Sequence, residues 1–387
     1  MKKILLTLAI IILPAGFFEA SAQTYDGAFY EFFFGRQPGA KAEAMGKGMA
    51  SVTGDAASYY YNPAGMGALQ GLNLGAAFAG PYYSTGNYKF GNSKYNFYNA
   101  SYNIKKYGTA GFSIDYFTYG LKQEYVITGE NGEKTGTGTY DPDITNYRIT
   151  LSSEVIKGLF AGVNLNYLHP DLFTDEFSVG NEKSGGNEDV FYFDLGVIKA
   201  FEIKSKKLNQ RINLGSSLIN VNSAEYTVTD ASQGDKLPVI FRIGAAYDLT
   251  TEDRNIISKL NSYKFLVNLE YDDLFNSKYF GGFNSGIEFT FLEMLSLRAG
   301  YYTQDFARKY VIIDSVGNAT GINYSQKTLS EFTYGAGINI PVNQLTKGKT
   351  PVELKLDYTY LKQPSYTDNQ DSPGKYHNFT IIFNWIF

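Results

Sequence analysis

The chain has no cysteine, a single tryptophan and only two histidines among its 387 residues. The lack of cysteine excludes a disulfide-stapled scaffold and a thiol-ligated metal site. His169 and His377 lie far apart in the sequence, and no His-x-x-x-His, Gly-x-Ser-x-Gly or paired-thiol motif is present. The motifs of zinc enzymes, α/β-hydrolases and thiol enzymes are therefore missing. We expect no catalytic residue, no metal and no cofactor.

Long hydrophobic runs are absent after the first 22 residues. Residues 1–22 have the pattern of a secretory signal peptide, with Lys2 and Lys3, an apolar run over 4–18, and small residues over 20–22. No later run approaches the length of apolar sequence that a membrane-spanning helix needs. The formal charge of −4 argues against a nucleic-acid partner, which would require a basic surface.

Aromatic residues and glycine are abundant instead. The chain contains 33 tyrosines, 29 phenylalanines and 40 glycines. Aromatic girdles at two membrane interfaces would account for the first excess. Tight turns and closely approached strands would account for the second. Without a spanning helix, only a closed β-barrel could embed the chain in a membrane, because every backbone N–H and C=O group must be paired there.

From residue 71 onward, apolar and polar residues alternate in segments of about ten residues, the length of a tilted transmembrane strand. In one segment, Val352, Leu354 and Leu356 alternate with Glu353 and Lys355. The pattern predicts an all-β fold, a 14-stranded antiparallel transmembrane β-barrel. Its strands are expected near 71–80, 94–103, 108–119, 143–155, 158–168, 189–201, 210–219, 237–249, 262–271, 280–292, 294–304, 330–341, 350–361 and 376–387.

The connections between these segments are alternately short and long. Short ones (105–107, 156–157, 293) are interleaved with long polar ones (120–142, 169–188, 220–236, 305–329). Short periplasmic turns and long external loops are typical of outer-membrane barrels. The pattern predicts the outer membrane of a Gram-negative bacterium, with both termini periplasmic. The polar face carries charges of both signs, which predicts interior ion pairs rather than an ion-selective pore.

The final segment has one apolar face, formed by Phe379, Ile381, Phe383, Trp385 and Phe387 at alternate positions. A terminal strand that ends on an aromatic residue resembles the signal read by the barrel-assembly machinery. We expect this strand to pair with the first barrel strand and close the barrel. The alternative is a buried last strand of a soluble sandwich.

Residues 23–70 do not alternate and are rich in glycine, alanine and small polar residues. The runs over 39–46 and 54–66, the second containing Tyr-Asn-Pro-Ala-Gly, resemble the plug signature of the FadL superfamily of fourteen-stranded barrels. The resemblance implies a plug over 23–70 inside a barrel over 71–387. It implies a plug motif formed by Asn62, Pro63, Ala64 and Gly65.

Weaker matches over 237–247, 297–301 and 334–338 point to the PorV/PorQ branch, which is found with type IX secretion. PorV-type members are partners of a protein-export machine. The resemblance therefore implies a non-enzymatic accessory subunit, with outer-membrane lipid, the barrel-assembly machinery, and a translocon, an assembly barrel or its cargo as partners. FadL-type members carry hydrophobic compounds through a lateral opening, which is the alternative function. A general porin, which requires an open lumen, is a third.

An aromatic cluster just before the plug signature has two interpretations. Phe32, Phe33 and Phe34 lie in a run of five aromatic residues among six. They could line a ligand site, or they could pack the plug against the barrel wall. Packing is the interpretation we favour from the sequence.

Overall fold

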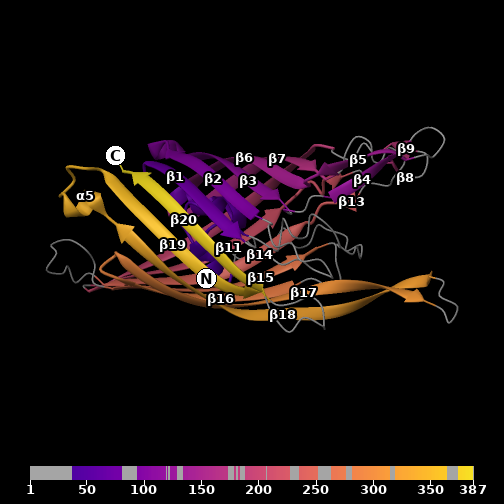
Figure 1. Ribbon diagram of the computed structural model, residues 1–387. Helices are drawn as coiled ribbons and strands as arrows, with labels where there is room; N and C mark the ends of the chain where they lie inside the picture. The colour runs from indigo at the N-terminus through magenta and orange to yellow at the C-terminus, as the bar shows by residue number, and fades with distance from the viewer. Residues whose placement is uncertain are drawn as a thin grey trace.

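The computed structural model describes residues 37–80, 94–118, 120, 123–128, 134–172, 178–179, 182–183, 188–205, 207–226, 235–251, 263–275, 281–313, 319–363 and 374–386. Fourteen antiparallel strands form a closed barrel (Figure 1). The predicted fold class is therefore confirmed. The expected signal peptide and Phe387 lie outside the described residues.

The wall strands follow the chain around the barrel, and each pairs with its two neighbours. They are β1 (Leu72–Gly80), β2 (Lys94–Asn103), β3 (Thr109–Thr118), β6 (Asp143–Ile156), β7 (Leu159–Asp171), β10 (Val190–Lys204), β11 (Leu208–Ile219), β14 (Ile240–Thr251), β15 (Tyr263–Leu274), β16 (Gly281–Phe291), β17 (Leu295–Ile313), β18 (Ala319–Ile340), β19 (Val352–Gln363) and β20 (Gly374–Trp385).

Among the described residues, short helices occupy two places. Three belong to the segment before β1: α3 (Ala40–Ala44), α4 (Ser58–Tyr61) and η3 (Pro63–Ala68). Two others, η4 (Lys105–Tyr107) and α5 (Val342–Leu345), join wall strands at one end of the barrel. We call this end, where β1 begins and β20 ends, the short-turn end, and the opposite one the long-loop end.

Three small hairpins lie within the long connections of the barrel. They pair β4 (Gln123–Thr128) with β5 (Lys134–Tyr140), β8 (Ser178–Val179) with β9 (Glu182–Lys183), and β12 (Glu225–Tyr226) with β13 (Asp235–Lys236). All three lie in connections at the long-loop end. The sequence predicted polar loops here, because these connections lack an alternating pattern of apolar and polar residues. Short strand pairs that face water on both sides do not need such a pattern.

The expected loop over 305–329 is also largely strand. β17 and β18 stay paired from Leu295↔Ile338 out to Ile313↔Ala319, well past their barrel neighbours. Their outer halves project beyond the barrel as a two-stranded ribbon on the side opposite α5 (Figure 1). The predicted strands 294–304 and 330–341 are the wall portions of this hairpin.

The last strand closes the barrel, as its pattern indicated. β20 pairs with β1 from Leu72↔Trp385 to Gly80↔His377. Phe379 and Trp385 face outward, with 53% and 43% of each side chain exposed, and Phe383 lies on the same face. The alternate residues of β20, such as Asn378, are buried on the lumen side.

The same alternation of burial runs around the wall. Outward positions carry large apolar side chains that are exposed, including Leu74, Phe112, Ile149, Leu165, Leu195, Leu269, Ile287, Leu297, Ile338, Leu356 and Ile381. A continuous apolar exterior on a closed barrel is the lipid-facing surface of a transmembrane barrel. Among the described helices, none is long and apolar enough to cross a membrane.

Leu356→Arg tests the direction assigned to β19. Leu356 faces outward, whereas Lys355 faces the lumen and forms an ion pair with Glu353 (3.4 Å). Arginine on the lipid face near the midplane should lower the free energy of unfolding by about 2–4 kcal/mol. Lys355→Leu should lower it by about 0–1 kcal/mol, because the ion pair is partly exposed. Urea unfolding in lipid vesicles measures both, and the reverse ranking would contradict the assigned facing.

Candidate functional site

The segment before β1 lies inside the barrel. α3 contacts β17, β18, β19 and β20, while η3 contacts β3, β6, β7 and β10 on another part of the wall. Most residues between Gln37 and Leu69 are buried. The described part of the plug, 37–70, therefore spans the lumen between distant parts of the wall.

Glycines on the lumen face of the wall allow the plug backbone to approach closely. A Cβ atom at Gly196 would lie 1.9 Å from Asn62 Oδ1, and one at Gly300 would lie 2.1 Å from the backbone nitrogen of Gly46. Other wall glycines that a Cβ would bring against the plug are Gly111, Gly162, Gly215, Gly286 and Gly335. Gly162, Gly215, Gly286 and Gly300 lie against the plug backbone, and the other three lie against plug side chains, so a larger residue would clash at each position.

Polar wall side chains bind the plug's own backbone groups. The helices of the plug are short, so many of its N–H and C=O groups have no partner within a helix and need such partners when buried. The bonds are Asn99 Nδ2 to the Ala56 carbonyl (2.8 Å), Asn164 Nδ2 to that of Tyr59 (2.8 Å), Ser217 Oγ to that of Tyr61 (2.6 Å), Asn268 Nδ2 to that of Gly48 (2.5 Å), Thr333 Oγ1 to that of Ala44 (2.8 Å), and the Ala40 N–H to Thr380 Oγ1 (2.8 Å).

Asn62 is the central residue of the predicted plug motif. Its side-chain oxygen accepts a hydrogen bond from the Ala64 N–H (3.0 Å) and so caps η3. Its amide nitrogen lies within donating distance of the carbonyls of Ala50 (2.7 Å), Val197 (3.1 Å) and Ser216 (3.1 Å). Val197 and Ser216 are opposed residues of β10 and β11. Asn62 thus joins the plug to two adjacent wall strands.

The rest of the motif shapes the turn. Pro63 is the first residue of η3, where a missing N–H is tolerated. Gly65 donates to the Asn62 carbonyl (3.0 Å), and a Cβ at this position would lie 2.7 Å from that of Ser58. The motif therefore holds the plug against the wall, and no member of it is exposed to solvent.

Two buried arginines of the wall lie over the tyrosines of α4. The guanidinium of Arg148 (β6) lies 5.0 Å from the ring centre of Tyr59 and 5.8 Å from that of Tyr60. That of Arg242 (β14) lies 5.5 Å from Tyr60 and 5.7 Å from Tyr61. Such cation–π contacts are strongest where water is excluded. We call Tyr59, Tyr60 and Tyr61, with the two guanidinium groups over them, the aromatic layer of the plug.

The two guanidinium charges are balanced by carboxylates. Arg148 Nη1 lies 2.8 Å from Asp115 Oδ2, and Arg242 Nε lies 3.8 Å from Glu270 Oε1. Interior ion pairs were expected from the sequence, and each of these two connects adjacent strands of the wall, β3 with β6 and β14 with β15. Burial raises the pKa of the three α4 tyrosine hydroxyls, so they remain neutral at physiological pH.

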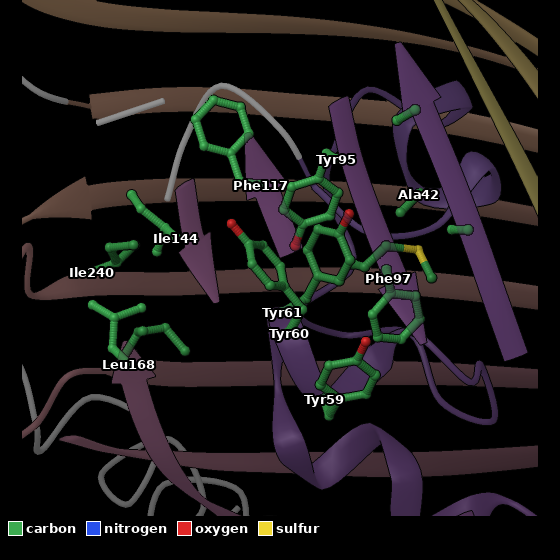
Figure 2. Packing of buried hydrophobic residues seen from close by; sticks show 14 of the residues in the cluster. Ala42, Tyr59, Tyr60, Tyr61, Tyr95, Phe97, Phe117, Ile144, Leu168 and Ile240 are labelled. Carbon is green, nitrogen blue, oxygen red and sulfur yellow. The ribbon is translucent and has the colours of Figure 1, made fainter. Parts of the chain in front are cut away.

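The lumen beyond the aromatic layer, toward the long-loop end, is lined by apolar side chains. They come from nearly every part of the wall: Ala77, Ala79, Tyr95, Phe97, Phe117, Ile144, Leu168, Val190, Ile219, Ile240, Leu274 and Leu361. Figure 2 shows rings of this set beside Tyr59, Tyr60 and Tyr61, with Ile144, Leu168 and Ile240 facing the same interior. A water-filled porin would carry polar residues here.

The opposite half of the lumen is ionic. A cavity of about 310 Å³ opens beneath the plug near the short-turn end and is lined mainly by charged and amide side chains. Lys41 of α3 lies 3.3 Å from Glu288, which also binds Arg298 (2.5 Å). Burial lowers the pKa of Lys41, but the charges of Glu288 and Asp55 outweigh this effect and raise it. The plug therefore separates an apolar half of the lumen from an ionic one.

Other candidate residues are not brought into a site. Phe32, Phe33 and Phe34 lie outside the described residues. His377 faces outward with its Nδ1 2.9 Å from the Tyr358 hydroxyl, whereas Asn378 faces the lumen. They occupy opposite faces of β20 and form no constellation. In the described part of the chain, no three His, Asp or Glu residues are grouped to hold a metal ion.

Two features of the contact between plug and wall were not predicted from the sequence. The wall glycines lie on the polar face of their strands, as Gly196 does two residues after Asp194. The sequence thus shows that these lumen positions have no side chain, but it does not show which segment lies against them. Interior charges were expected on the polar face of the strands, and Arg148 and Arg242 lie there. Their stacking on the α4 tyrosines could not be read from residue spacing, because the partners are distant in sequence.

No protein-family model and no curated protein matches this chain. Among solved structures, it is similar to the toluene transporter TodX of Pseudomonas putida, with 12% identity over 95% of this chain and 100% of that one and a TM-score of 0.43. The toluene transporter TbuX of Ralstonia pickettii is 13% identical over 91% of this chain and 98% of that one, with a TM-score of 0.43. A Pseudomonas aeruginosa FadL homologue is 10% identical over 91% of this chain and 99% of that one, with a TM-score of 0.41.

These likenesses concern the barrel fold. Identities and TM-scores this low carry no argument about a substrate or a partner. The FadL side of the sequence resemblance is represented among these structures. The PorV/PorQ branch stays a prediction.

Gly196→Ala tests the close contact between plug and wall. The new methyl group would overlap Asn62 Oδ1, so the free energy of unfolding should fall by about 1–3 kcal/mol. In an Asn62→Ala background the same change should cost less, by about 1 kcal/mol or more, since the overlapping atom is gone. A double-mutant cycle by urea unfolding measures the coupling. Additive effects would contradict the contact.

Proposed function

We propose that this protein is an outer-membrane channel that takes up hydrophobic small molecules. The apolar lining of the long-loop half of the lumen carries this proposal. Water among such side chains gains few hydrogen bonds, whereas an apolar solute packed among them gains favourable burial at roughly 25 cal/mol per Å². Ligand sites are commonly apolar concavities with a few polar groups, which the arginine and tyrosine layer would supply.

The orientation follows from the lengths of the connections. Outer-membrane barrels place short turns in the periplasm and long loops outside. The short-turn end, with the start of β1 and the end of β20, is therefore assigned to the periplasm. A solute would enter from the long-loop end and meet the apolar half first.

The plug argues against a general porin. Wall side chains from β2, β7, β11, β15, β18 and β20 bind its backbone. Unseating it would leave many buried polar groups without partners, at about 1–3 kcal/mol each. A hydrophobic solute would also gain nothing from the ionic cavity beneath. Release sideways into the bilayer avoids that cavity, and we propose it as the route, without enzymatic chemistry.

Uptake by whole cells tests this function. Leu168→Gln and Ile240→Gln place amides in the apolar half, and together they should lower uptake of a radiolabelled aromatic hydrocarbon by about tenfold through lost apolar burial. Lys355→Gln, a change in the ionic cavity, is the matched control and should leave uptake nearly unchanged. Equal uptake by cells with and without the protein would rule the function out.

The projecting ribbon favours a second candidate, an accessory subunit of a protein-export or assembly machine. β17 pairs with β16 only as far as Gln304, and β18 pairs with β19 only from Thr333. Beyond these points neither ribbon edge is paired with another of the described wall strands, and such strand edges are common sites of strand addition by a partner.

Deleting residues 306–327 separates the two candidates. The deletion leaves the wall pairing intact, so the barrel should still fold. A co-purifying outer-membrane complex that is lost with the ribbon would support the accessory role. Retained hydrocarbon uptake in the same variant would show that the ribbon is dispensable for transport.

A further inference from the structure

Three neighbouring connections at the short-turn end form one continuous surface. They join β2 to β3 through η4, β6 to β7 through residues 157–158, and β10 to β11 through residues 205–207. These six strands are consecutive in the barrel wall. The surface therefore occupies one side of the rim, directly below a continuous part of the lipid-facing wall.

This surface carries an excess of lysine. Its described basic side chains are Lys105, Lys106, Lys157, Lys199 and Lys207. The acidic residues among them are Glu154 and Glu202, and Glu154 Oε1 already accepts the Gly158 N–H (2.5 Å). We call these five lysines and the residues between them the lysine rim.

Large apolar side chains stand among the lysines. Tyr107, Ile156 and Val155 are 71%, 64% and 56% exposed, more than most residues of the wall. The Lys106 ammonium lies 5.0 Å from the ring centre of Tyr107. Lys199 donates to the Lys157 carbonyl (2.9 Å), which holds its charge at the base of the turn. The apolar groups would be costly in water but suit the boundary between acyl chains and headgroups.

At the other end of the same strands, the described acidic residues outnumber the one described lysine, Lys94. Asp143 and Asp171 are directly opposed across β6 and β7, and Asp189 lies beside His169 (2.6 Å). The charge is therefore segregated along the membrane normal on this side of the barrel. A scattered surface charge that served solubility alone would show no such separation.

We propose that the lysine rim binds the headgroups of anionic phospholipids in the leaflet at the short-turn end. The outward residues above it, such as Tyr102 and Leu151, belong to the exposed apolar band of the wall. Because that band continues into Ile104 and Val155, the ammonium groups lie where lipid phosphates begin. Lysines at such a surface are attracted to anionic lipid. This inference depends on the barrel being in a membrane and not on its transport function.

Native mass spectrometry tests the proposal with full-length protein. The protein is purified into micelles containing equal amounts of dioleoyl phosphatidylglycerol and dioleoyl phosphatidylcholine. We expect the wild-type protein to retain phosphatidylglycerol preferentially. The variant Lys105→Gln/Lys106→Gln/Lys157→Gln/Lys207→Gln should lower the ratio of the two bound lipids by about tenfold or more.

Lys347→Gln/Lys349→Gln is the matched control, since these exposed lysines lie at the same end but after β18. It should leave most of the preference intact, and heat-dependent gel mobility verifies folding of each variant. No preference in the wild type, or an unchanged ratio in the fourfold variant, would overturn the proposal. The proposal would also be overturned if the fourfold variant kept the same ratio of bound lipids but lost a co-purifying protein. That result would make the lysine rim a protein-docking surface.

Discussion

The close contact between plug backbone and barrel wall is the constraint on which the rest of the structure depends. At Gly196 and Gly300 the wall has no side chain, and the plug occupies the space that a Cβ would need. Because the two backbones lie this close, short polar side chains of the wall reach the plug's N–H and C=O groups directly. A segment with few helices of its own is thereby held in one arrangement, and its buried polar groups are paired.

The plug in turn divides the lumen by polarity. Toward the long-loop end, the α4 tyrosines and the arginines over them adjoin apolar side chains from most of the wall. Toward the short-turn end, Lys41, Glu288 and Arg298 connect the plug to a network of ion pairs. Such pairs tolerate burial because each charge has a partner. The same segment therefore packs against an apolar interior on one side and stabilises charges on the other.

The wall could be predicted from the sequence because lipid outside and plug inside impose a period of two on every strand. The β20 pattern, from Phe379 to Trp385, located even the closing pair. Prediction failed where that constraint ends. The β17–β18 ribbon leaves the membrane, so residues such as Asp305 to Ile313 were taken for a loop. The plug seat was also missed, because a glycine such as Gly196 does not specify which backbone lies against it.

The central claim is that the seated plug closes the lumen to water and ions. Planar-bilayer recording tests it most directly, with the intact protein compared with a variant that lacks residues 37–69. The intact protein should show no large, steady conductance, whereas the variant should open a continuous channel through the fourteen-stranded barrel. Steady conductance by the intact protein at the level of the plug-deleted variant would contradict the account.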